Sequence, residues 1–341
     1  MWYIPKKPYK AWKINISDFP AKKSFSDQIK YLIRYAVLAP STFNTQPWVF
    51  SIKKNSVTIS PDLKRKLLTS DRNDRLLYIS TGCAVKNFEI SARVHGFDID
   101  KTYENKPKYT QVTLSLSKNG KNTDKKALIN ILSRLTNRNP YTNKQLSSKT
   151  ISRLKNIAKN NGVNFKIISD EKGRNKIMKL AERGDLVLWG DKNFLSEHLQ
   201  WIRNNLTRKY DGMPAFTVQI SLVPSIFAGI ALKNINFAKM QAKKNHQLLS
   251  TTPHFGFIVS KGNSREEWIK SGEALEEIWL YLNQVGASLA PQAQVIAVPE
   301  LLKDLKTTLK TELQPQFFFR IGFATKHAYH SPRRPVHEVL K

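Results

Sequence analysis

Three segments of this 341-residue chain carry side chains that suit a ligand rich in oxygen atoms. The first reads Ala39-Pro-Ser-Thr-Phe-Asn-Thr-Gln-Pro-Trp48, and its proline predicts the end of a helix. Ser41, Thr42 and Asn44 then offer short hydrogen-bonding groups in a turn beside that helix end. The residues alone leave a second interpretation open, an ordinary polar turn with Trp48 in the core.

The other two segments are rich in arginine. SRLTNR places Arg134 and Arg138 four residues apart, with Thr136 between them, and HSPRRP places Arg333 and Arg334 on a stiff, non-helical stretch. A guanidinium binds phosphate through a planar fork, and a nearby hydroxyl adds a donor. Solvated arginines and a basic tail are the alternative interpretation for a chain of this charge.

The formal net charge is +30, from 56 basic and 26 acidic side chains, and the excess is spread along the chain. No zinc finger, RNP-type sequence or basic region followed by heptads is present, so we expect no specific nucleic-acid partner. The positive field still favours anionic ligands such as a phosphorylated cofactor. Apolar residues make up 40% of the chain, which is typical of a globular protein.

Cys83 is the single cysteine, which excludes an internal disulfide and a thiolate metal cage within one chain. No other metal-ligand spacing is visible, and no apolar signal region follows the N-terminus. Residues 213–232 carry no charge, but Pro214 and Pro224 predict a buried helix or helix pair there rather than a membrane span. We therefore expect a soluble, cytoplasmic protein without membrane contact.

Apolar periodicity predicts helices over 26–39, with Ser26 near the N-cap, and over 74–96, 147–162 and 265–286. Strands are predicted over 47–52, 108–117, 163–169, 253–261 and 315–324. A polar linker over 118–126 separates two stretches of similar pattern, and a further short helix precedes the SRLTNR turn. Helices ending at Gly96 and Gly286 occupy matching places. The chain is therefore expected to be α+β and built from two related halves, 1–125 and 126–341.

Taken together, these segments resemble the nitroreductase superfamily of FMN-binding proteins, in particular its long, internally fused, Acg-like branch. The resemblance covers nearly the whole chain. The segments that carry it are APSTFNTQPW (39–48), RLLYISTG (75–82), RLTNR (134–138), GEALEEIWLYLNQVG (272–286), RIG (320–322) and SPRRP (331–335).

The resemblance implies a nitroreductase-like fold in which the two halves form an internal pseudo-dimer. Family homodimers bind FMN at the interface, with the PSxxNxQPW segment from one subunit and the arginine segment from the other. Here each half supplies one of these segments, which implies one complete site per chain. The FMN phosphate would lie on Arg134, Thr136, Arg333 and Arg334. Other parts of FMN would contact Arg138, Ser41, Thr42, Asn44, Pro291 and Gln292, while Gln46 would orient the turn.

The implied activity is NADH- or NADPH-dependent two-electron reduction of a nitroaromatic or quinone-like acceptor by an FMN enzyme. Residues 190–250 are insertion-like and could cover the flavin, so a flavin-binding or storage protein with little turnover is the alternative. Oxidation of a peptide or amino-acid-derived substrate is a third interpretation. Three histidines are possible proton sources, although an ordinary core or surface role is the favoured interpretation of each: His254, His330 and His337. We expect a monomer or a loose homodimer.

Overall fold

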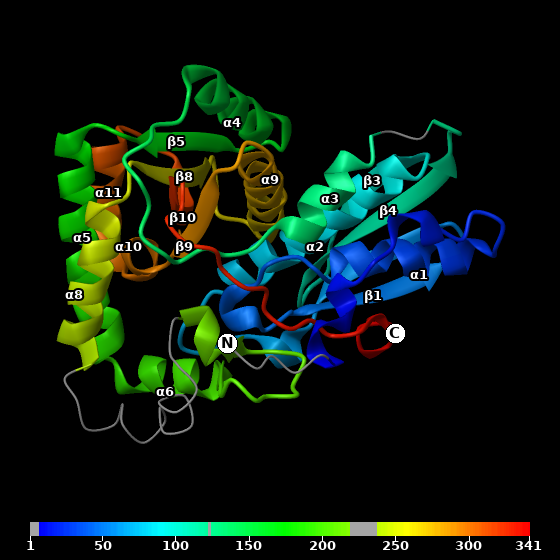
Figure 1. Ribbon diagram of the computed structural model, residues 1–341, viewed down its shortest axis with the longest axis horizontal. Coiled ribbons are helices and arrows are strands. Elements are labelled where there is room, and N and C mark those ends of the chain that lie inside the picture. The colour runs from blue at the N-terminus through cyan, green and yellow to red at the C-terminus, as the bar shows by residue number, and fades with distance from the viewer. Residues whose placement is uncertain (1–6, 122–123, 219–236) are drawn as a thin grey trace.

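The computed structural model describes residues 7–121, 124–218 and 237–341 (Figure 1). The described chain is α+β and contains two four-stranded antiparallel sheets. The first sheet has the order β1-β2-β4-β3, formed by β1 (Trp48–Lys53), β2 (Ser56–Pro61), β3 (Phe97–Asn105) and β4 (Thr110–Lys118). The second has the order β5-β8-β10-β9, formed by β5 (Asn164–Ile168), β8 (His254–Ser260), β9 (Ser288–Gln292) and β10 (Gln314–Gly322).

The two sheets share one topology. In each, the strands are arranged first, second, fourth, third, and every neighbouring pair is antiparallel. A helix precedes the first strand, namely α1 (Phe25–Ala36) or α4 (Ser148–Asn160). A 20-residue helix joins the second strand to the third, namely α2 (Arg75–Val94) or α9 (Arg265–Gln284). This repetition is what two related halves require.

Local signals explain where these helices begin and end. Helix α1 starts earlier than expected, because the Ser24 side chain, rather than that of Ser26, accepts the Asp27 N–H at 3.2 Å as the N-cap. Helix α9 begins with a capping box between Ser264 and Glu267. It ends before Gly286, whose φ of 75° suits glycine after a helix.

Helices α2 and α9 pack against each other between the two sheets (Figure 1). Gly82 and Gly272 lie where the helices cross, and a Cβ added to either would approach the backbone oxygen of Ile269 or Ile79 to 2.0 Å. Only glycine allows so close an approach of two backbones. Buried side chains of both helices, among them Phe88 and Trp279, then join one apolar core.

The C-terminal segment crosses from the second sheet to the first (Figure 1). The Phe50 N–H donates to the Val339 carbonyl and the Lys341 N–H donates to the Phe50 carbonyl, both at 2.8 Å, beside the free edge of β1. Helix α3 (Lys126–Ser133) in turn contacts both α2 and α9. Residues from beyond position 125 therefore complete the packing of the first sheet.

The region after β5 is largely helical. It holds α5 (Glu171–Gly190), α6 (Lys192–Trp201) and α8 (Phe237–Ser250), and α8 lies alongside α5 (Figure 1). Two short strands, β6 (Ile202–Arg203) and β7 (Met213–Pro214), pair in parallel. Two short helices, α10 (Gln294–Ala297) and α11 (Leu302–Leu309), lie between β9 and β10.

The prediction of a helix or helix pair over 213–232 is wrong for the first residues of that range. Residues 213–214 form β7, and Ala215–Val218 form a 3₁₀ turn. The Asn205 side chain accepts the Phe216 N–H at 2.7 Å, which fixes the turn locally. Residues 219–232 lie outside the described part of the chain. Among the described helices, none is long and apolar enough to cross a membrane.

Candidate functional site

A cavity of about 550 Å³ is lined by residues from both sides of position 125. One wall comes from α2 and the turn after α1, a second from α9, β9 and β10, and a third from α5, α6 and α8. Six of the eleven residues that the sequence singled out line it: Ser41, Thr42, Thr136, Arg138, Pro291 and Gln292. Asn44, Gln46, Arg134, Arg333 and Arg334 do not line it.

The turn after α1 has a strained backbone. Phe43, Asn44 and Gln46 have φ values of 51°, 55° and 51°, in the left-handed region that disfavours side chains other than glycine. Such residues cost on the order of 1–3 kcal/mol each, and persist where the surrounding structure holds them in place. The strain presents Pro40, Ser41, Thr42 and Phe43 to the cavity.

Asn44 is one of the two residues that hold the turn. Its side-chain N–H groups donate to the carbonyls of Gly212 at 2.9 Å and Pro332 at 3.0 Å. Its side-chain oxygen accepts a hydrogen bond from Arg333 Nη1 at 2.9 Å. The hydrogen-bonding groups of the Asn44 side chain are therefore all used within the chain itself, and they connect the turn to two distant segments.

Gln46 is the second residue that holds the turn. Its Nε2 donates to the Tyr210 carbonyl at 2.7 Å, and its Oε1 accepts the backbone N–H of Arg334 at 2.7 Å. The Gln46 backbone N–H also donates to Ser41 Oγ at 2.9 Å. The Arg334 side chain donates to the carbonyl of Glu338 at 2.7 Å and to that of Gln46 at 3.4 Å.

Arg134 and Arg333 form a buried charged cluster behind the cavity wall. Both donate to the Leu38 carbonyl, at 2.8 Å and 3.1 Å, and Arg134 Nε lies 3.2 Å from a carboxylate oxygen of Glu276. The Arg134 guanidinium also lies 4.8 Å from the ring of Trp279, which lines the cavity. Burial raises the pKa of Glu276 to about 7, although Arg134 opposes the shift. Arg333 Nε is buried without a hydrogen-bond partner among the described residues.

Three cationic side chains line the cavity itself: Arg138, Arg320 and Lys244. Arg320 is fully buried and donates to the carbonyls of Leu248 and Arg138, both at 3.2 Å. Arg138 donates to the Thr217 carbonyl at 3.3 Å. Burial and the charge of Arg320 lower the pKa of Arg138 to about 10. Burial and the charge of Arg138 lower the pKa of Lys244.

Aromatic rings form much of the remaining surface of the cavity. His198 lies 4.7 Å from Phe43 and 4.8 Å from Trp189, ring centre to ring centre, in edge-to-face arrangements. Burial and then the charge of Arg138 lower the pKa of His198 to about 4, so this imidazole is neutral at pH 7. The other cavity-lining aromatic residues are Phe194, Phe237, Trp279 and Phe317.

Asp185 is a buried carboxylic acid in the cavity wall. Its Oδ2 accepts a hydrogen bond from Asn245 Nδ2 at 2.7 Å, which connects α5 to α8. Burial raises the pKa of Asp185 to about 7, and the negative charge of Glu182 adds to the shift. Asp185 can therefore carry a proton close to neutral pH.

The three histidines considered from the sequence lie away from this cavity. His254 accepts the Leu146 N–H at 2.9 Å and contacts Ser169 Oγ at 2.7 Å, and burial lowers its pKa to about 4. His330 stacks on Trp12 with ring centres 3.8 Å apart. His337 is exposed near the C-terminus. Their surroundings fit structural or surface roles.

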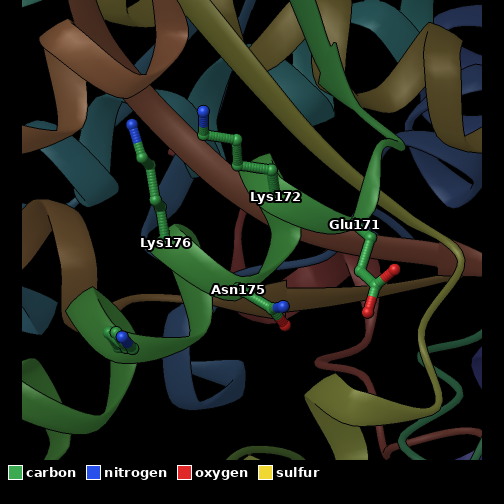
Figure 2. Close-up of a pocket in the computed structure, with 5 residues that line it drawn as sticks. Glu171, Lys172, Asn175 and Lys176 are labelled. Atoms are coloured by element: carbon green, nitrogen blue, oxygen red, sulfur yellow. The ribbon is translucent and has the colours of Figure 1, made fainter.

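A second hollow lies on the outer surface of α5 (Figure 2). It is lined by Glu171, Lys172, Asn175 and Lys176 together with Lys179, all of them exposed. Figure 2 shows the side chains of Lys172 and Lys176 extending outward from one helix and that of Glu171 pointing away from them. No second element in this hollow directs a polar group toward them, so it does not have the form of a binding site.

The polar residues of the cavity that sequence reasoning missed include four with ionisable side chains, namely Asp185, His198, Lys244 and Arg320. Arg320 belongs to the RIG segment (320–322) that carried the resemblance, but the resemblance assigned it no role. Lys244 is one of several lysines on α8, and no local pattern separates it from Lys243. Among the described residues, no group of three or more His, Cys, Asp or Glu side chains could hold a metal ion.

Comparisons with known proteins gave structural similarities only. One similar structure is the FMN- and NADPH-dependent nitroreductase NfnB from Sphigopyxis sp. strain HMH, with 14% identity and a TM-score of 0.42 over 63% of this chain and 96% of that one. Another is the FMN-dependent nitroreductase NfnB from Mycobacterium smegmatis in complex with NADPH, with 14% identity and a TM-score of 0.42 over 63% and 97%. A nitroreductase-like family protein from Bacillus cereus has 12% identity and a TM-score of 0.40 over 65% and 97%. No protein-family model matches the chain, and no curated protein matches it.

Proposed function

We propose that this protein binds FMN in the cavity between its two halves and acts as an FMN-dependent oxidoreductase of the nitroreductase type. One observation carries the proposal. The turn that contains Ser41 and Thr42 meets Thr136, Arg138 and residues 291–292 at a single cavity, although these segments are far apart in the sequence. The sequence resemblance assigned the same segments to one flavin site, independently of the structure.

The chemistry of the cavity fits a flavin nucleotide. Aromatic and aliphatic side chains form a slot suited to a flat ring system. Hydroxyl, amide and cationic side chains outnumber carboxylates along the same walls, which suits a ligand with hydroxyl groups and a phosphate. Behind the cavity wall, the buried Nε of Arg333 has no hydrogen-bond partner among the described residues and offers a further donor to an anion.

In this proposal Ser41, Thr42 and Thr136 hold the hydroxyl-bearing part of FMN. The resemblance assigns the phosphate to Arg134, Thr136, Arg333 and Arg334. Of these only Thr136 lines the cavity, so contact with the three arginines requires the wall in front of them to move when FMN binds. Pro291 and Gln292 flank the ring. Asn44 and Gln46 act indirectly, because their hydrogen bonds fix the turn that carries Ser41 and Thr42. The residue segments 1–125 and 126–341 then correspond to the two subunits of an internal pseudo-dimer.

Bound FMN supplies two-electron transfer from NADH or NADPH to an acceptor such as a nitroaromatic or a quinone. The aromatic walls exclude water from the site. Arg138 places a positive charge beside the reacting region, where it stabilises negative charge that develops during reduction. Asp185 holds a proton at its carboxyl group near neutral pH.

Anaerobic mixing tests the proposal. NADH or NADPH is expected to bleach the flavin absorbance, and a nitroaromatic or quinone is expected to restore it. Donor and acceptor use the same cavity, so steady-state kinetics should be ping-pong. If the protein takes up no FMN, the assignment of FMN as the cofactor is wrong. If the protein binds FMN but neither NADH nor NADPH reduces it, the assignment as an oxidoreductase is wrong.

The second candidate is a flavin-binding protein with little turnover. It is favoured by α5, α6 and α8, whose side chains form one complete wall of the cavity. A covered flavin should react slowly with both nicotinamides but should be bleached readily by dithionite, which is small. Fast reduction by either nicotinamide rejects this candidate.

A further inference from the structure

Three cationic side chains line the cavity without a carboxylate partner among the described residues, namely Arg138, Arg320 and Lys244. Arg320 is fully buried and donates from both Nη atoms to backbone carbonyls, which leaves Lys244 and Arg138 to a ligand. Lys244 lies on α8 and Arg138 follows α3, and the charge of Arg138 lowers the pKa of Lys244. No ion pair involves either residue among the described residues. The stretches outside the description, 1–6, 122–123 and 219–236, contain no aspartate or glutamate, so they cannot supply a carboxylate.

The carboxyl group that lines the same cavity does not neutralise this pair. Asp185 is hydrogen-bonded to Asn245, and its pKa is raised to about 7 by burial and by Glu182. Its surroundings are therefore those of a carboxyl group without a cationic partner. Two further residues of the cavity wall, Gln241 and Gln292, have uncharged side chains. His198 also lines the cavity, and its pKa of about 4 makes it neutral at pH 7.

Like charges facing one partly desolvated cavity repel each other, and an anion placed between them relieves that repulsion. Aromatic rings line the cavity beside these cations, including Trp189 on α5 and Phe194 on α6. A ligand that fits both features has a flat aromatic body and one anionic group. A neutral ligand would leave both cations uncompensated.

We propose that Lys244 and Arg138 bind the carboxylate of an aromatic substrate, so that the protein prefers carboxylate-bearing aromatic acceptors to neutral ones. The inference rests on the proposed function for turnover, but binding of the carboxylate is independent of it. The proposed function places the FMN phosphate on the side of Arg134 and Arg333, which both donate to the Leu38 carbonyl behind the cavity wall. Lys244 lies on a helix outside the segments that resemble flavin-binding proteins, which leaves it to the substrate.

The test uses 4-nitrobenzoate and 4-nitrobenzamide, which differ in charge but hardly in shape. Calorimetric titration of the protein as purified should show tighter binding of the benzoate. Lys244→Gln should weaken the benzoate about tenfold, the effect of losing one hydrogen bond to a charged group, and leave the benzamide unchanged. Lys244→Arg should retain most of the affinity. The matched control is Lys243→Gln on the same helix, because both lysines are exposed but only Lys244 lines the cavity.

Equal affinity of the wild type for benzoate and benzamide would overturn the inference, and so would equal weakening of both by Lys244→Gln. Binding of FMN and riboflavin provides the second comparison. If Lys244→Gln weakened FMN but not riboflavin, Lys244 would belong to the cofactor phosphate and the inference would be wrong. The protein could also bind 4-nitrobenzoate in a way that depends on Lys244 and yet take up no flavin. That result would support the inference and reject the proposed function.

Discussion

Gly82 on α2 and Gly272 on α9 face each other at a helix crossing so close that neither position has room for a methyl group. Cys83 Sγ lies 3.3 Å from the Gly272 carbonyl at the same place. Ile79 and Cys83 on one helix, and Trp279 on the other, then form part of the cavity wall. The close approach of α2 and α9 beside the cavity therefore depends on this pair of glycines.

Gly272→Ala should therefore destabilise the protein by about 1–3 kcal/mol, the usual cost of overpacking a core. Its Cβ would meet the backbone oxygen of Ile79, which cannot move without displacing α2. Urea unfolding would measure the loss. Gly190→Ala is the matched control, because a Cβ there meets no atom within 4 Å. Equal stability of the two variants would show that the helices do not cross as described.

Arg134→Ala should weaken FMN binding by about 10- to 100-fold, the loss expected for a hydrogen bond to a charged group. Fluorescence quenching of added FMN would measure it, with Lys121→Ala, an exposed residue of the linker, as the control. The variant also leaves the Glu276 carboxyl group buried without its cation. Adding Glu276→Gln should restore stability but not FMN affinity. Recovery of both would assign Arg134 a purely structural role.

Gln46→Ala should lower stability by about 1–3 kcal/mol, since it leaves the buried Arg334 N–H without a partner. It should also weaken FMN binding, because the turn that carries Ser41 loses its connection to the C-terminal segment. Lys54→Ala is a matched control: Lys54 has a similar φ of 50° but lies in the exposed β1–β2 hairpin turn. Thermal unfolding and FMN titration of both variants would check this, and wild-type behaviour of Gln46→Ala would contradict it.

Asp185 should make stability depend on pH. Its folded pKa of about 7 exceeds its unfolded value, so its contribution is fully present at low pH and is lost as pH rises through about 7. Asp185→Asn retains an oxygen that can accept from Asn245 but cannot ionise. Relative to wild type, this variant should become progressively more stable between about pH 4 and pH 7, and the difference should stay constant above pH 7. A constant difference across that range would show that Asp185 has an ordinary pKa.

Much of the fold could be predicted from apolar periodicity, because the long helices and the central strands bury one side or both. The expected helix over 265–286 is α9 (Arg265–Gln284), and the expected strand over 315–324 is β10 (Gln314–Gly322). The strands that were missed include two sheet edges. β3 carries several charged residues, and β9 contains Pro291, which an edge strand tolerates and a central strand does not.

The candidate site could be predicted only in part. Motif residues that face the cavity, such as Ser41 and Arg138, share a local pattern that sequence reasoning can detect. The partners of Asn44 lie 168 and 288 residues away, at Gly212 and Pro332, and no local pattern encodes such hydrogen bonds. Lys244 belongs to the site only because α8 packs along α5.

The most direct measurement is the flavin content of the purified protein. The account predicts a yellow protein whose absorbance spectrum shows bound flavin, and which releases FMN on denaturation in a molar ratio close to one per chain. A colourless protein that also remains flavin-free after incubation with excess FMN would contradict it.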